Sequence, residues 1–255
     1  MLRLVTGLKQ DVIPLQKSMI KLLSLADLIS IVNAVFGFLA VLFLFSDAVI
    51  PLKDTRIHVS FSFILLALLA DGLDGIVARW RGSSRLGEYL ESMADMSSLC
   101  IAPAVFIYFV YSPTMGCCLY RYVYLLIALM LFLFFGVIRL ASFHIMKQEK
   151  FFIGLPASAS AIMLLVMSYF MVGFIYILPA VVIIGAVMIS DIRFPKPSVR
   201  MNIVAALLIF LAILIGKNFY GFAPGLLFIM VLLYAVFGPF YVKFFSERLN
   251  KNISK

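Results

Sequence analysis

Four carboxylates between Asp71 and Asp95 are the residues of this sequence best suited to chemistry. Asp71 and Asp74 are three residues apart at the end of one apolar segment, and Glu91 and Asp95 are four residues apart at the start of the next. Either spacing places both side chains on one face of a helix, so antiparallel packing of the two helices would bring the four acids together. Such a cluster repels itself unless a cation neutralises it, and oxygen ligands suit hard divalent ions. We therefore predict a site for Mg²⁺ or Mn²⁺, with Ca²⁺ as a further option, in which two ions would clamp a diphosphate.

The residues between the two acid pairs suit the same chemistry. Gly72, Gly75 and Ala78 have almost no side chain, which lets backbone and ligand approach closely. Forked donors for phosphate oxygens are available at Arg79, Arg81 and Arg85.

Ordinary salt bridges at a membrane interface are the alternative explanation for these charges. Asp71 argues against it, because this residue directly follows the apolar run LLALLA, where a charge is costly without a function. Arg81 alone is equally compatible with a loop charge that sets membrane orientation.

The composition predicts an all-α integral membrane protein. Of the 255 residues, 64% are hydrophobic and 13% are charged, and the mean hydropathy is +1.13, whereas a soluble domain has about a quarter of its residues charged. A helix needs about 20 apolar residues to cross a bilayer. The sequence contains about eight such segments, at roughly 23–46, 56–79, 88–112, 119–146, 153–172, 174–191, 200–216 and 223–245.

The distribution of basic residues predicts the orientation in the membrane. The net charge of +9 is concentrated in alternate loops and at both termini, which indicates a cytoplasmic membrane protein rather than a nucleic-acid-binding one. Both termini and the carboxylate cluster are therefore expected to face the cytoplasm. Residues 1–22 are too polar for a signal peptide and are expected to form a short amphipathic segment on the cytoplasmic surface.

The stretch from Asp71 to Asp95 resembles the signature of the CDP-alcohol phosphotransferases. That signature runs D-x-x-D-G-x-x-A-R, then seven or eight residues, then G-x-x-x-D-x-x-x-D. One family position differs, because Glu91 replaces the third aspartate and moves its carboxylate outward by one methylene. The positions that match in identity and spacing are Asp71, Asp74, Gly75, Ala78, Arg79, Gly87 and Asp95.

The resemblance implies a membrane-embedded helical enzyme, usually a homodimer, that displaces CMP from a CDP-linked lipid or alcohol. It implies that Asp95 is the general base and that the four acids hold the metal. The residues that would shape the CDP pocket are Asp71, Gly75, Ala78, Arg79 and Gly87.

Further stretches resemble the phosphatidylserine synthase branch, which includes the archaetidylserine synthases. They are SIVNAVFGFLAV with Asn33, IRLASFH with Arg139, FFIGLPASASA, and MISDIRFPK with Arg193 and Lys196. Asn33 is predicted to join the CDP pocket, although a hydrogen bond between helices would also explain it. The candidates for binding a phosphate or the serine carboxylate are Arg81, Arg85, Arg139, Arg193 and Lys196.

These patterns predict a six-helix core at 23–200 and two additional helices with a basic tail at 201–255. The predicted reaction is attack of the L-serine hydroxyl on a CDP-linked lipid, with diacylglycerol and archaeol tails both open. Other acceptors, such as glycerol 3-phosphate or inositol phosphate, are the alternative within the family. A divalent-cation transporter is the alternative from a different class, and an inactive relative that binds CDP-lipid is a third.

Overall fold

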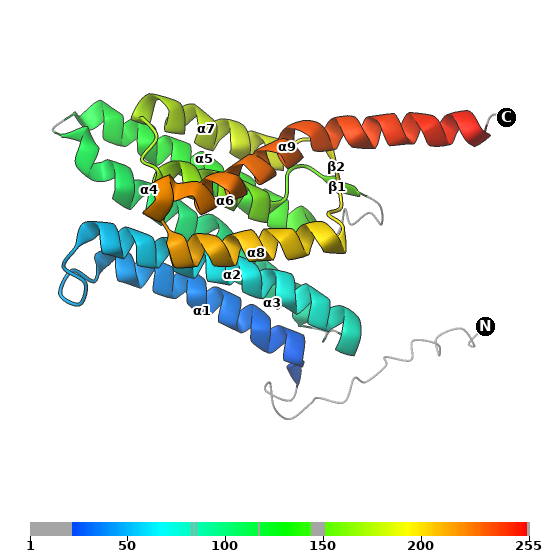
Figure 1. Cartoon of the computed structure of the whole chain (residues 1–255), viewed down its shortest axis with the longest axis horizontal. Coiled ribbons are helices and arrows are strands. Elements are labelled where there is room, and N and C mark those ends of the chain that lie inside the picture. The colour runs from blue at the N-terminus through cyan, green and yellow to red at the C-terminus, as the bar shows by residue number, and fades with distance from the viewer. Residues whose placement is uncertain (1–21, 83, 85, 117, 144–150, 254–255) are drawn as a thin grey trace, which may run out of the picture.

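The computed structural model describes residues 22–82, 84, 86–116, 118–143 and 151–253, except for the side chains of 245–253. The predicted N-terminal amphipathic segment therefore lies outside the described residues. The elements form a bundle of roughly aligned helices (Figure 1). Their bounds are α1 Leu25–Phe45, α2 Lys53–Arg81, α3 Gly87–Asp95, the π-helix η2 Met96–Ile101, α4 Ala102–Tyr111, the 3₁₀-helix η3 Ser112–Met115, α5 Leu119–Phe143, β1 Phe151–Ile153, α6 Ala157–Tyr169, α7 Phe174–Met188, β2 Arg193–Pro195, α8 Val199–Ile215 and α9 Asn218–Ile253.

The helices agree with the predicted polytopic membrane fold. Among the described residues, five helical segments are long and apolar enough to cross a bilayer: α1, α2, the continuous segment Gly87–Met115, α5 and α9. The other three predicted segments are also helical, but α6, α7 and α8 have only 13, 15 and 17 residues. The protein is thus a polytopic helical membrane protein, and eight full crossings remain a prediction.

Local sequence signals set the start of α1 and the end of α2. A capping box begins α1, in which the Ser24 hydroxyl accepts from the Asp27 amide and the Asp27 carboxylate accepts from the Ser24 amide. Gly82 ends α2 with a φ of +84°, a conformation that side chains disfavour. The start of α1 and the end of α2 lie at the same end of the bundle (Figure 1).

A π-helix interrupts the third membrane segment immediately after Asp95. Such insertions are rare and occur frequently at functional sites. The π-helix lies unusually close to two neighbours, because a Cβ on Gly37 of α1 would be 2.7 Å from the Ser98 Cα, and one on Gly136 of α5 would be 2.7 Å from the Cys100 sulfur. Two glycines therefore allow α1 and α5 to pack tightly around the segment that follows Asp95.

A short antiparallel sheet joins two loops that are 40 residues apart in the sequence. β1 pairs with β2 in the register Phe151↔Pro195 and Ile153↔Arg193. This corrects the prediction of a helix from residue 153, because α6 begins only at Ala157. Gly154 makes the turn possible with a φ of +75°, and a Cβ there would meet the Met188 carbonyl oxygen.

The contact between α1 and the π-helix leads to a first prediction. Gly37→Ala should lower the apparent melting temperature in detergent, because the added methyl group meets the Ser98 backbone and overpacking costs about 1–3 kcal/mol. Gly225→Ala on α9 is the control, since a Cβ there meets no described atom within 4 Å. A melting temperature for Gly37→Ala as high as that of the control would contradict the close packing.

Candidate active site

The four predicted acids come from two neighbouring helices, as their spacing predicted. Asp71 and Asp74 lie in the last three turns of α2, and Glu91 and Asp95 lie on α3. Asp74 and Asp95 are buried, with 4% and 9% of their surface exposed, while Asp71 and Glu91 are half-buried. The end of α2 and the helix α3, which carry these residues, lie toward the right of Figure 1.

The acids interact with one another rather than with basic residues. Asp71 and Asp95 lie close enough to interact, and both carboxyl groups experience repulsion from Asp74 and Glu91. Among the described residues, no ion pair involves Asp71, Asp74 or Asp95. Within the part of the chain that the structure describes, salt bridges to basic residues therefore do not account for these three acids.

Two side chains of α1 hold the two buried acids. The Ser30 hydroxyl donates to the Asp74 carboxylate at 2.6 Å, and the Asn33 amide nitrogen donates to the Asp95 carboxylate at 3.0 Å. Both donors are buried, and they are one helical turn apart on the face of α1 that contacts α2 and α3. The Asn33 carbonyl oxygen is buried and has no hydrogen-bond partner among the described residues.

The acids suit a divalent cation by their chemistry, because they are an all-oxygen donor set with uncompensated repulsion. Their side chains are not in final coordination positions: among the described residues, no three His, Cys, Asp or Glu side chains converge closely enough to hold an ion. Metal binding would thus require side-chain rotations.

The residues predicted to shape the CDP pocket lie beside the acids. A Cβ on Gly75 would be 3.9 Å from a terminal nitrogen of Arg79, so the guanidinium lies over the glycine one turn earlier. Ala78 and Gly87 are half-buried, and Arg79 and Arg81 are exposed at the end of α2. Arg85 lies outside the described residues.

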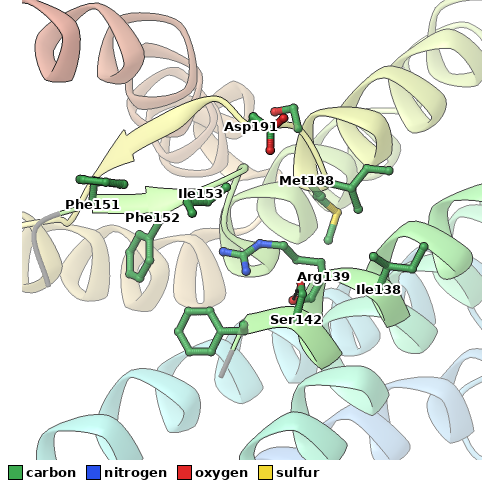
Figure 2. A pocket seen from close by; sticks show the side chains of 11 residues that line it. Ile138, Arg139, Ser142, Phe151, Phe152, Ile153, Met188 and Asp191 are labelled. Atoms are coloured by element: carbon green, nitrogen blue, oxygen red, sulfur yellow. Dashed lines mark hydrogen bonds between the residues drawn. The ribbon is translucent and has the colours of Figure 1, made fainter. Parts of the chain in front are cut away.

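Arg139 lines a separate cavity of about 150 Å³ near the same end of the bundle (Figure 2). This arginine is buried, with 7% of its surface exposed, and among the described residues it has no acidic partner. Its Nε donates weakly to the Leu155 carbonyl at 3.4 Å, and its guanidinium lies 5.3 Å from the ring centre of Phe143. The rest of the lining comes from Ile138 and Ser142 on α5, from Phe151–Ile153, and from Met188–Asp191.

The other two predicted cations lie on or beside β2. The Arg193 guanidinium is 4.9 Å from the ring centre of Phe151, and the Lys196 ammonium is 5.4 Å from that of Phe152. Both cations are exposed. The sheet thus brings three sequence stretches together around one cavity: the one with Arg139, the one with Phe151 and Phe152, and the one with Arg193.

Sequence reasoning missed Ser30 and the role of the sheet. The signal for Ser30 was present, because buried polar residues recur at Asp27, Ser30 and Asn33 on one face of an otherwise apolar helix. No comparable signal marks the sheet, since each strand has only three residues and its partner is far away in the sequence.

Comparison with known proteins agrees with this geometry. The model of the CDP-alcohol phosphatidyltransferase family matches residues 23–192. The chain is 31% identical over 220 residues to a CDP-diacylglycerol–serine O-phosphatidyltransferase of Methanocaldococcus jannaschii, covering 86% of this chain and 94% of the relative. It is 32% identical over 187 residues to an archaetidylserine synthase of Methanothermobacter thermautotrophicus, covering 71% and 73%. A CDP-diacylglycerol–serine O-phosphatidyltransferase of Helicobacter pylori is 32% identical over 165 residues, or 59% of this chain and 67% of the relative.

The fold and the acid cluster are those of a polytopic membrane transferase that handles activated alcohols. The chain belongs to the CDP-alcohol phosphatidyltransferase family, which confirms the resemblance seen in the sequence. The family is generally dependent on divalent metal. Family membership favours an enzyme over the cation transporter that the sequence left open.

Metal binding by the acids leads to a second prediction. Mg²⁺ or Mn²⁺ should raise the apparent melting temperature of the purified protein, because an ion that binds the folded state stabilises it. Asp74→Asn should lose most of this shift. The matched control, Asp47→Asn, changes an exposed acid at the opposite end of the bundle and should keep it. Equal shifts in both variants would place the ion elsewhere.

Proposed function

We propose that the chain transfers a phosphatidyl or archaetidyl group from a CDP-linked lipid to the hydroxyl of L-serine and releases CMP. The observation that carries the proposal is the acid cluster with Asp95 held by Asn33. The relatives of this chain are named as a serine O-phosphatidyltransferase and as an archaetidylserine synthase, so their names cover both kinds of lipid. The lipid tails would lie along the bundle in the bilayer, and the CDP head would lie at the end that bears the acids.

The CDP head would bind along the end of α2. Gly75 and Ala78 leave space beside the helix backbone, and Arg79, which already lies over Gly75, offers forked donors to phosphate oxygens. The proposed metal ligands are Asp71, Asp74, Glu91 and Asp95, with two Mg²⁺ or Mn²⁺ ions, which would neutralise charge on the diphosphate and its leaving group.

Asp95 is the proposed general base. The serine oxygen would form a bond to the lipid-linked phosphorus as its proton passes to Asp95, and the bond from that phosphorus to the CMP oxygen would break. Asn33 supports this role, because its amide donates to one Asp95 oxygen and restricts the orientation of the carboxyl group. The buried, unpartnered carbonyl oxygen of Asn33 offers an acceptor beside the reacting atoms.

Packing between α5 and the π-helix supports placing the acceptor cavity next to Asp95. Gly136 contacts Cys100, and α5 runs antiparallel to the segment that contains α3. Toward the end of the bundle that bears the acids, Arg139 lies three residues after Gly136 on α5. On the neighbouring segment, Asp95 lies five residues before Cys100, at the end of α3. At about 1.5 Å per residue, the two residues differ little in depth.

Arg139 is the proposed partner of the serine carboxylate. Its burial and its lack of a described acidic partner leave a cation without a paired carboxylate in a small, mostly apolar cavity, and an anion of matching size would neutralise it. A planar guanidinium can bind a carboxylate through two parallel hydrogen bonds. Arg193 and Lys196 would add positive potential at the cavity rim, and Arg81 and Arg85 would do so near the diphosphate.

The proposed orientation places the acids in the cytoplasm. Support comes from the exposed cations at the same end of the bundle, which include Arg79, Arg81, Arg193, Lys196 and Lys243. We further propose that the chain is a homodimer in the cytoplasmic membrane, as the family resemblance implies.

A third prediction tests the reaction and the base. With CDP-diacylglycerol or CDP-archaeol, Mg²⁺ or Mn²⁺ and L-serine, the purified protein should release CMP in a serine-dependent manner. Asp95→Asn should slow the release at least about 100-fold, because general-base catalysis contributes this much, and should still bind CDP-lipid. CMP release that is independent of serine under every lipid and metal would refute the proposed acceptor, and normal turnover by Asp95→Asn would refute the base.

The same assay separates the remaining alternatives. Release driven by glycerol 3-phosphate or inositol phosphate in place of serine would identify another acceptor. Glu91→Asp restores the aspartate of the family signature and should be assayed together with the wild type. Activity that appears only in Glu91→Asp would identify the wild-type chain as an inactive relative.

A fourth prediction concerns Arg139. Arg139→Leu should raise the KM for serine about tenfold or more, since a hydrogen bond to a charged group is worth about 1.5–3 kcal/mol, and should leave the KM for CDP-lipid nearly unchanged. The KM for serine of Arg139→Lys should lie between the values of the wild type and Arg139→Leu, because lysine keeps the positive charge but cannot form two parallel hydrogen bonds to a carboxylate. Arg121→Leu, at an exposed arginine near the opposite end, is the control. Parallel increases in both KM values would indicate a general structural effect instead.

A further inference from the structure

The C-terminal helix α9 begins 26 residues after the family match ends at residue 192, and it contains none of the motifs discussed above. Its first turn has left-handed backbone at Phe219–Gly221, after which a continuous helix crosses the bundle and extends beyond it (Figure 1). One polar side chain of this helix, Tyr234, points to the sheet. Its hydroxyl donates to the Pro195 carbonyl oxygen at 2.9 Å.

Two more contacts fix β2 on α9. The Tyr234 ring lies 6.0 Å from the ring of Phe194, which is almost fully buried. One turn later, a Cβ on Gly238 would be 2.9 Å from the Pro195 ring, so the backbone of α9 lies directly against this ring. The strand is therefore held by a hydrogen bond, a ring contact and a close backbone approach, all from one face of α9.

This attachment extends to the cavity of Arg139. Pro195 is paired with Phe151, and Phe151–Ile153 form one wall of that cavity (Figure 2). A shift of β2 on α9 would thus move the cavity wall opposite Arg139, while the acids and their α1 donors lie on other elements.

We propose that Tyr234 is a positioning residue for the acceptor, and that α9 determines acceptor affinity by fixing the β1–β2 sheet over Arg139. The proposal rests on the proposed function, in which this cavity binds the serine carboxylate. It predicts that loss of the Tyr234 hydroxyl affects the acceptor selectively and leaves the CDP-lipid site intact.

Tyr234→Phe is the test, since it removes only the hydroxyl. The KM for serine should rise about fivefold, because a typical net hydrogen bond is worth about 1 kcal/mol, while kcat and the KM for CDP-lipid change less than about twofold. Gly238→Ala, which crowds Pro195, should have the same selective effect. Tyr176→Phe, at an exposed tyrosine of α7, should have none.

Hydrogen exchange of the substrate-free protein gives an independent readout. Backbone amides of 151–155 and 193–194 should exchange faster in Tyr234→Phe than in the wild type or in Tyr176→Phe. Unchanged exchange would overturn the attachment, whatever the reaction is. Faster exchange with an unchanged acceptor KM would overturn the role in acceptor affinity. If the wild type uses an acceptor other than serine, the proposed function fails, and the KM for that acceptor tests Tyr234 instead.

Discussion

Repulsion among four carboxylates inside a membrane protein is the constraint on which the rest of the structure depends. Water, which would ordinarily screen such charges, is largely excluded, because Asp74 and Asp95 are buried. The described structure offers them hydrogen bonds from Ser30 and Asn33 rather than basic partners. This leaves the cluster short of positive charge, and a site with that deficit favours a divalent cation and the phosphates that accompany it. The close contact of α1 with the π-helix at Gly37 follows from the same need, since the donors reach the acids only if the helices nearly touch.

The sequence predicted the parts of this arrangement that depend on regular periodicity. The eight apolar segments are all helical, and the i, i+3 and i, i+4 spacings of the acids did identify one cluster, because both features repeat with the helix itself. The β1–β2 sheet was not predictable in this way. The sequence Phe151–Ile153 is equally compatible with the start of a helix. Its pairing with Arg193–Pro195 is accompanied by contacts far away in the sequence, between β2 and α9 and between Gly154 and Met188 of α7. Of the two donors on α1, the sequence predicted Asn33 and not Ser30. Asn33 is a large polar group in an apolar helix, whereas a serine in such a helix often forms a hydrogen bond only to its own backbone.

The two halves of the proposed site are built from different kinds of structure. The acids and their donors lie on long helices, where the position of each side chain is fixed by backbone geometry. The cavity of Arg139 has one wall from α5 and another from a strand of three residues that needs α9 for support. A division of this kind allows an acceptor site to change while the metal and CDP site is kept, since few contacts are common to both.

The order of these elements along the chain has a consequence for synthesis in the membrane. Every residue of the acid cluster and its donors lies between Ser30 and Asp95, so this part is complete once three membrane segments have been inserted. The acceptor cavity needs β2 and its attachment to Tyr234, about 140 residues later than Asp95. A nascent chain would consequently expose a complete acid cluster to the bilayer well before it could bind an acceptor. Early capture of a cation at the proposed metal site would remove the repulsion during this interval, so the ion would assist assembly of the protein as well as the proposed reaction.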